Sequence, residues 1–66
     1  MGEYSVNTIA TSAGEDGWSG LYSILKVTED GEQTLASLRR APGVFTDMLD
    51  ALSNADEVAR AFIAQI

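Results

Sequence analysis

The sequence predicts an α+β fold in which a three-stranded antiparallel sheet, ordered as a meander, packs on one C-terminal amphipathic helix. Two Glu-Asp-Gly segments, at 15–17 and 29–31, predict hairpin turns, because Asp-Gly readily adopts the positive backbone angles that tight turns need. After position 46 the apolar residues instead recur at steps of three and four, which is the period of a helix. Two hairpins followed by one helix make a single domain of 66 residues.

The first two predicted strands cover residues 4–11 and 18–28. In the first strand Tyr4, Val6, Thr8 and Ala10 alternate with Ser5, Asn7, Ile9 and Thr11. In the second strand Leu21, Leu25 and Val27 point to one side, and Trp18, Tyr22 and Ile24 to the other. The second strand is therefore apolar on both faces, which is unusual for a sheet with one solvated side.

The third predicted strand, residues 33–40, depends on the second turn. A two-residue loop at Asp30-Gly31 would set Val27 opposite Thr34 and Leu25 opposite Ala36. It would also set two carboxylates, at 29 and 32, opposite each other, so a longer loop is an alternative. Residues 34–40 could also form a helical turn, because two leucines there are three residues apart. We prefer a strand, since the segment follows a hairpin signal and Pro42-Gly43 would end it.

The C-terminal segment predicts one helix over residues 46–65. Its apolar side comprises Met48, Leu49, Leu52, Ala55, Ala59, Phe62, Ile63 and Ile66. Thr46 is the expected N-cap, with Asp47 in the first turn. A break at Ser53-Asn54 is an alternative, but the apolar stripe keeps its phase through that point. We expect this helix to bury Leu25, Val27 and Leu38 of the sheet against Leu49, Leu52, Ala59 and Phe62.

Composition excludes several classes of function. The net charge of −6 opposes binding to nucleic acid or to an anionic membrane, and a basic protein remains a suitable partner. Without histidine or cysteine, the usual catalytic triads and thiolate metal sites cannot form. We expect no enzymatic activity, no cofactor and no metal site. No apolar run reaches the roughly 20 residues of a membrane span and no signal segment opens the chain, which predicts a cytoplasmic protein.

Two surfaces are candidates for binding a partner. The first is the sheet face away from the helix, where the expected register exposes Trp18, Tyr22, Ile24 and Leu35. The second is an acidic helix stripe of Asp47, Asp50 and Glu57, which a basic protein could bind as it binds phosphates. Each surface also has a simpler interpretation. The residues of the first could merely cover an edge of the core, and those of the second could form the solvated face of an amphipathic helix.

The order of three strands and a helix is similar to that of HicB-type antitoxins and of integrase arm-binding domains. The integrase type uses a basic sheet, whereas this chain is acidic. Residues 29–35, Glu-Asp-Gly-Glu-Gln-Thr-Leu, resemble a turn of the MbtH-like proteins, which are partners of nonribosomal peptide synthetases. Ala36-Ser37 stands where that family has a tryptophan-proline signature, so the resemblance ends at Leu35 and implies no function.

These observations predict a small acidic, non-catalytic regulatory protein that binds another protein or itself. A homodimer would cover the second sheet face or an edge strand, since a domain of this size buries only about 60% of its unfolded surface. The alternative is an acidic inhibitor, of the kind phages use against host defence, that occupies a basic nucleic-acid-binding surface with its helix stripe.

Overall fold

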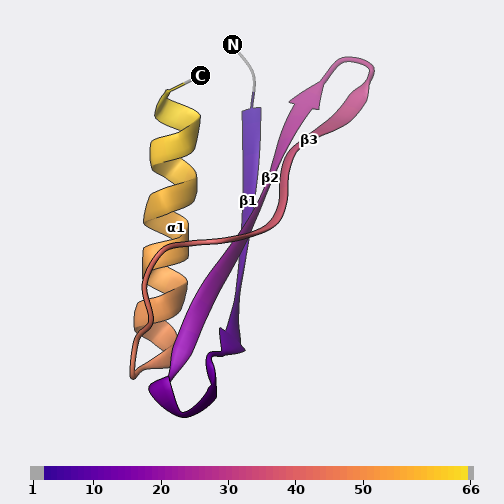
Figure 1. Cartoon of the computed structure of the whole chain (residues 1–66). Coiled ribbons are helices and arrows are strands. Elements are labelled where there is room, and N and C mark those ends of the chain that lie inside the picture. Colours follow the sequence, from indigo (N-terminus) through magenta and orange to yellow (C-terminus); the bar gives the residue numbers. More distant parts are fainter. Residues whose placement is uncertain (1–2, 66) are drawn as a thin grey trace.

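The computed structural model describes residues 3–65, apart from the side chain of Asp16. The elements are β1 (Glu3–Ser12), a 3₁₀ turn (Gly14–Asp16), β2 (Trp18–Thr28), β3 (Gly31–Arg40) and α1 (Met48–Ala64) (Figure 1). The strands form one antiparallel sheet in the order β1-β2-β3, and α1 packs on one side of it. The predicted α+β architecture is therefore confirmed, with one continuous helix and with a strand in the third position.

The first hairpin fixes which residues of β1 and β2 share a face. Val6 pairs with Ile24, Thr8 with Tyr22 and Ala10 with Gly20, and paired residues of an antiparallel sheet point to the same side. The connection closes with a hydrogen bond of 2.8 Å from the Ala13 N–H to the Gly17 carbonyl oxygen. All even-numbered residues of the two strands consequently lie on one face of the sheet and all odd-numbered residues on the other.

The second hairpin differs from the predicted register. Its two loop residues are Glu29 and Asp30, and Gly31 is already paired with Thr28. Gly31 keeps a positive φ, 130°, but the two-residue loop lies one residue earlier than we expected, so Gly31 follows the loop. Val27 therefore lies opposite Glu32, and Leu25 lies opposite Thr34, each two positions away from the prediction.

Two irregularities in β3 bring its far end back into the predicted register. Leu35 is an extra residue on β3 between the pairs Leu25–Thr34 and Ile24–Ala36, and β3 gains another before the pair Tyr22–Arg39. At the second irregularity Leu38 has a φ of 47°, which is rare for leucine, and its N–H donates to Ser23 Oγ at 3.0 Å.

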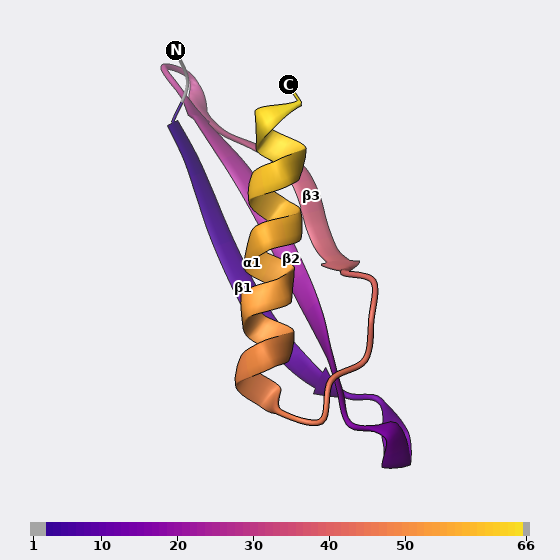
Figure 2. The same ribbon diagram turned by 90° about the vertical axis from the view of Figure 1, so that its left-hand side faces the viewer.

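The helix covers the sheet face opposite to the one that we predicted. Tyr22 and Ile24 are buried beneath it, whereas Val27 and Leu38 are exposed, so the predicted contacts of Leu25, Val27 and Leu38 with α1 are wrong. Figure 2 shows α1 lying across the face of the sheet over β1 and β2. The buried centre of α1 is a row of alanines, Ala51, Ala55 and Ala59, flanked by Val58, Phe62 and Ile63.

Close approach of the helix to β2 explains this choice of face. A Cβ added at Gly20 would overlap the carbonyl oxygen of Ala51 and lie 2.8 Å from the Ala55 Cβ. Only glycine on the strand and alanine on the helix leave room for this contact. In addition, β1 contributes Tyr4 and Val6 to the even-numbered face but mostly polar residues to the odd-numbered face.

The N-cap of the helix lies one residue later than predicted, and the helix covers Met48–Ala64 where residues 46–65 were expected. Asp47 is the N-cap, and its Oδ1 accepts a hydrogen bond of 2.9 Å from the Leu49 N–H, so the expected N-cap at Thr46 is wrong. Asn54 Nδ2 donates to the Pro42 carbonyl oxygen at 2.7 Å, which attaches one side of α1 to the segment that follows β3.

Candidate protein-binding surfaces

The sheet face away from α1 carries a row of apolar side chains, which we call the outer row: Ile9, Leu21, Leu25 and Val27. Ile9 is 48% exposed and Val27 is 43% exposed. Within residues 3–65 no element packs over this face (Figure 1). Apolar groups of two neighbouring strands, β1 and β2, therefore meet solvent on this face, with Leu21 and Leu25 half-buried.

Charged side chains stand at the two ends of the outer row. Val27 is paired with Glu3 on β1 and with Glu32 on β3, so a carboxylate lies on each side of it. At the other end Leu21 is paired with Ile9 and Arg40, and Arg40 Nη2 donates to Ser19 Oγ at 2.9 Å. The outer row thus has an acidic end and an end with a guanidinium, and the polar pair Ser23–Asn7 separates Leu25 from Leu21.

The two edges of the sheet differ in their regularity. β3 has two irregularities, a left-handed Leu38 and two adjacent arginines, all of which hinder pairing with another strand. β1 pairs with β2 over ten consecutive residues without an irregularity, has no proline or lysine, and has Glu3 as its one charged residue. Its outer edge is not paired with any other strand of the described chain.

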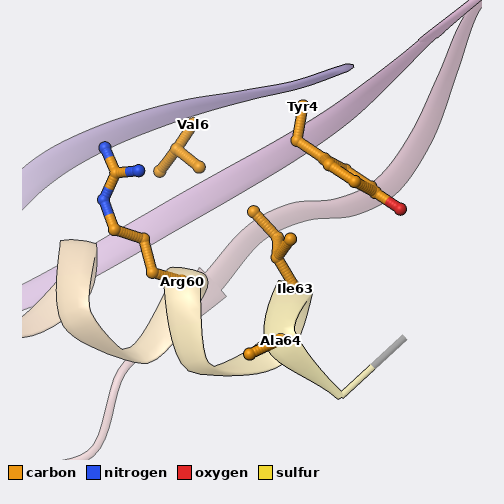
Figure 3. Close-up of a pocket in the computed structure, with 5 residues that line it drawn as sticks. All are labelled: Tyr4, Val6, Arg60, Ile63 and Ala64. Atoms are coloured by element: carbon orange, nitrogen blue, oxygen red, sulfur yellow. The ribbon is translucent and has the colours of Figure 1, made fainter. Parts of the chain in front are cut away.

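An open cleft of about 340 Å³ lies beside β1, between that strand and the C-terminal half of α1. Tyr4 and Val6 line it from β1, and Arg60, Ile63 and Ala64 line it from α1 (Figure 3). Arg60 Nε donates to Asp56 Oδ2 at 2.9 Å, and this hydrogen bond, together with the charge of Asp56, raises the pKa of Arg60. The cleft is apolar, with one cation at its rim.

The side of α1 that faces this cleft continues toward the start of the helix. At 100° per residue, Leu49, Leu52, Asp56, Arg60 and Ile63 fall within about 80° of arc. We call these five residues the helix flank. Leu49 is 66% exposed, which is more than Ile9, Val27 or Leu38. The opposite side of the helix is the one that Asn54 attaches to the segment after β3.

Of the four residues of the predicted aromatic and aliphatic cluster, Tyr22, Ile24 and Leu35 belong to the core or pack against it. Tyr22 is 7% exposed and Ile24 is completely buried, so the prediction that they lie on an exposed face is wrong. Leu35 is half-buried and packs against the same core, and Trp18 is half-buried at the start of β2. The Trp18 backbone forms hydrogen bonds of 2.7 and 2.8 Å with that of Phe45.

The predicted acidic stripe is exposed along α1. Asp50 and Glu57 are both exposed, seven residues apart and therefore two turns from each other. Asp47 is also exposed, but its carboxylate caps the helix. The stripe thus consists of two unengaged carboxylates and one that already accepts a backbone hydrogen bond.

Neither the outer row nor the helix flank was predicted from sequence as a candidate surface. The signal for the outer row was present: the even-numbered side of β1 is the more apolar one, and a hairpin closed between Ser12 and Trp18 aligns it with Tyr22 and Ile24. The helix flank had no such signal, because Leu49 and Leu52 belong to the apolar side of the helix in sequence.

Comparisons with known proteins identify no relative. No family model, no curated protein and no solved structure matches the chain. Separately, none of the helices among the described residues has the length and apolar character required to span a bilayer.

Proposed function

We propose that this chain is a non-catalytic interaction protein that binds another protein through the outer face of its sheet. The observation that carries the proposal is the outer row, four apolar side chains on a sheet face that no element packs over within residues 3–65, with Ile9 and Val27 exposed. Burial of apolar surface is favourable by roughly 25 cal/mol per Å², so a partner that covers the row gains free energy from it. The lack of histidine and cysteine in the sequence supports a binding role over a catalytic one.

The charges around the outer row define the chemistry of the partner. Glu3 and Glu32 flank Val27, and the whole chain carries a net charge of −6. A protein that presents an apolar strip ending in lysine or arginine side chains would match both the row and its acidic end. The apolar contact would supply affinity that salt does not remove, and the charges would supply orientation and speed of association.

Affinity capture from the cells that make the protein tests this proposal, using tagged wild type and two substituted chains. Val27→Asp introduces a carboxylate into the outer row. Val44→Asp is the matched control, because Val44 is 47% exposed, has the same side chain and lies in the segment between β3 and α1. We expect one protein to co-purify with wild type and with Val44→Asp at low and high salt, and to be lost with Val27→Asp.

Two results would count against the proposal. Capture that is equal for Val27→Asp and Val44→Asp would remove the outer row as the binding surface. Capture that disappears in high salt and with Asp50→Lys would instead support the acidic-inhibitor alternative, in which the helix stripe binds a basic protein. Circular dichroism of each variant shows whether the variant is folded, so that a loss of capture caused by unfolding can be recognised.

A further inference from the structure

We infer that two copies of this chain associate edge to edge through β1 and form a six-stranded sheet with both helices on one face. The inference rests on the proposed function in taking protein association as the role, and it names a second copy as one partner. Its first support is the contrast between the two edges. β3 carries the features that prevent edge pairing, whereas β1 presents ten regular residues with one charge.

Symmetry limits the strand register of such a dimer. A two-fold axis perpendicular to the sheet keeps both helices on one side, so even-numbered residues must pair with even-numbered residues. Two central pairs are then possible near the middle of β1, Asn7 with Asn7 or Thr8 with Thr8 of the two copies. Both side chains are uncharged, so either register places no repulsive pair at the axis.

The net charge of the protein does not oppose this contact strongly. The one charged residue of β1 is Glu3, at the end of the strand. In either register the two Glu3 residues lie at opposite ends of the paired strands, about 26 Å or more apart at 3.3 Å per residue. This separation exceeds the Debye length of about 8 Å at physiological salt, so their repulsion is screened.

The helix flank and the cleft form a second, self-complementary part of the interface. The two-fold axis that pairs the strands also sets the two α1 helices antiparallel, so the N-terminal half of each lies beside the C-terminal half of the other. Leu49, at 66% exposed, is in the N-terminal half, and the apolar cleft formed by Tyr4, Val6 and Ile63 is beside the C-terminal half. Leu49 of each copy can therefore fill the cleft of the other.

The ion pair on the flank fits the same arrangement. Asp56 and Arg60 are bound to each other within one chain and lie near the middle of the helix flank. Two antiparallel flanks bring two such pairs together with opposite charges facing each other, which favours the antiparallel orientation over a parallel one. Leu49 and Leu52 of one copy and Ile63 of the other then lie at each end of this charged centre.

The size of the contact sets the expected affinity. A ten-residue strand is about 33 Å long, and the thinnest dimension of the molecule is 14 Å, which gives about 460 Å² of flat area per copy. This places the interface at the small end of specific complexes, so we expect a dissociation constant on the order of micromolar. The accessible surface of the chain, 4585 Å², exceeds the roughly 4,000 Å² typical of a monomer of this mass.

Sedimentation equilibrium from about 1 µM to about 500 µM tests the inference. We expect the mass to rise from 7.0 kDa toward twice that value. Leu49→Asp should weaken association at least about tenfold, whereas the matched Val44→Asp should leave it unchanged. Asn7→Lys and Asn7→Glu should each weaken it, because the exposed new charge would face a like charge across the axis in one register and the apolar Ile9 in the other.

Mixing experiments distinguish the two registers. A mixture of Asn7→Lys and Asn7→Glu should restore association if Asn7 pairs with Asn7, and a mixture of Asn7→Lys and Ile9→Glu should restore it if Thr8 pairs with Thr8. A wild type that stays at 7.0 kDa throughout would overturn the inference. A dimer that Leu49→Asp and the Asn7 variants leave intact would overturn it as well.

The inference and the proposed function can fail separately. If Val27→Asp abolishes capture of a partner while wild type stays monomeric, the outer row binds that partner and the β1 dimer does not form. If the dimer forms as described and Val27→Asp has no effect on capture, the dimer stands and the outer row has no such role.

Discussion

The replacement Gly20→Ala tests how the helix is seated on the sheet. Gly20 lies on β2 beneath α1, and an added Cβ would overlap the Ala51 carbonyl oxygen and approach the Ala55 Cβ to 2.8 Å. The backbone at Gly20 is not in the left-handed region, so alanine would otherwise be tolerated in this strand. Any loss of stability should therefore come from the contact with α1.

The expected magnitude follows from the cost of overpacking. Both clashing groups belong to the helix, one of them its backbone, so relief requires α1 to move away from β2. Such changes cost about 1–3 kcal/mol, which is a large fraction of the roughly 3–10 kcal/mol expected for a chain of this length. We expect the melting temperature to fall by about 5–20 °C, measured by circular dichroism together with urea unfolding.

Gly14→Ala provides the control for backbone effects. Gly14 has a φ of 74°, and a Cβ added there would meet no other atom within 4 Å. Its replacement should therefore lower the free energy of unfolding by about 1–2 kcal/mol through backbone strain alone. If Gly20→Ala were as stable as wild type, the helix could not be seated on β2 at Ala51 and Ala55. The description of the core would then be wrong.

Three further substitutions, two of them with a control variant, test other parts of the fold by urea unfolding. Ile24→Ala should cost about 2–5 kcal/mol because Ile24 is completely buried, whereas Val27→Ala on the exposed face should cost much less; equal losses would mean that the faces are assigned incorrectly. Asp47→Ala should cost about 1 kcal/mol by removing the N-cap, and Thr46→Ala should have almost no effect; the reverse order would support the cap predicted from sequence. Leu38→Gly should be neutral or stabilising by up to about 1 kcal/mol, because Leu38 has a positive φ and is 58% exposed; a clear loss of stability would mean that its side chain packs in solution.

The architecture could be predicted from sequence because local signals agreed with it. The two Asp-Gly turns, the alternation around Val6 and Ile24, and the helical period after position 46 each identify an element without knowledge of its neighbours. The apolar stripe of the C-terminal segment also keeps its phase through Ser53-Asn54, and the helix is continuous there in the structure.

The face of the sheet that the helix covers could not be predicted from β2 alone. Leu25 and Val27 on one side are as apolar as Tyr22 and Ile24 on the other. The choice depends on a tertiary contact, the fit of Gly20 against Ala51 and Ala55, and small residues carry no hydrophobic signal. The candidate surfaces in the structure therefore differ from the predicted ones, because residues that we expected on the exposed face of the sheet lie in the core.

The predicted register of the second hairpin was wrong for a related reason. The Asp-Gly signal correctly located a turn, but the loop begins at Glu29, so the glycine follows the loop instead of forming part of it. The two extra residues of β3, one of them beside the left-handed Leu38, then compensate for the shift. Nothing in the residues 33–40 indicates these irregularities, since a left-handed leucine is disfavoured by its own side chain.

The most direct test of the proposed binding surface is a methyl NMR titration of the protein with the partner that it captures. The account predicts that methyl signals of Ile9, Leu21, Leu25 and Val27 change on addition of the partner, while those of Val58 and Val44 do not. Changes confined to methyl groups of α1, with the outer row unaffected, would show that the partner binds the helix side and would contradict the account.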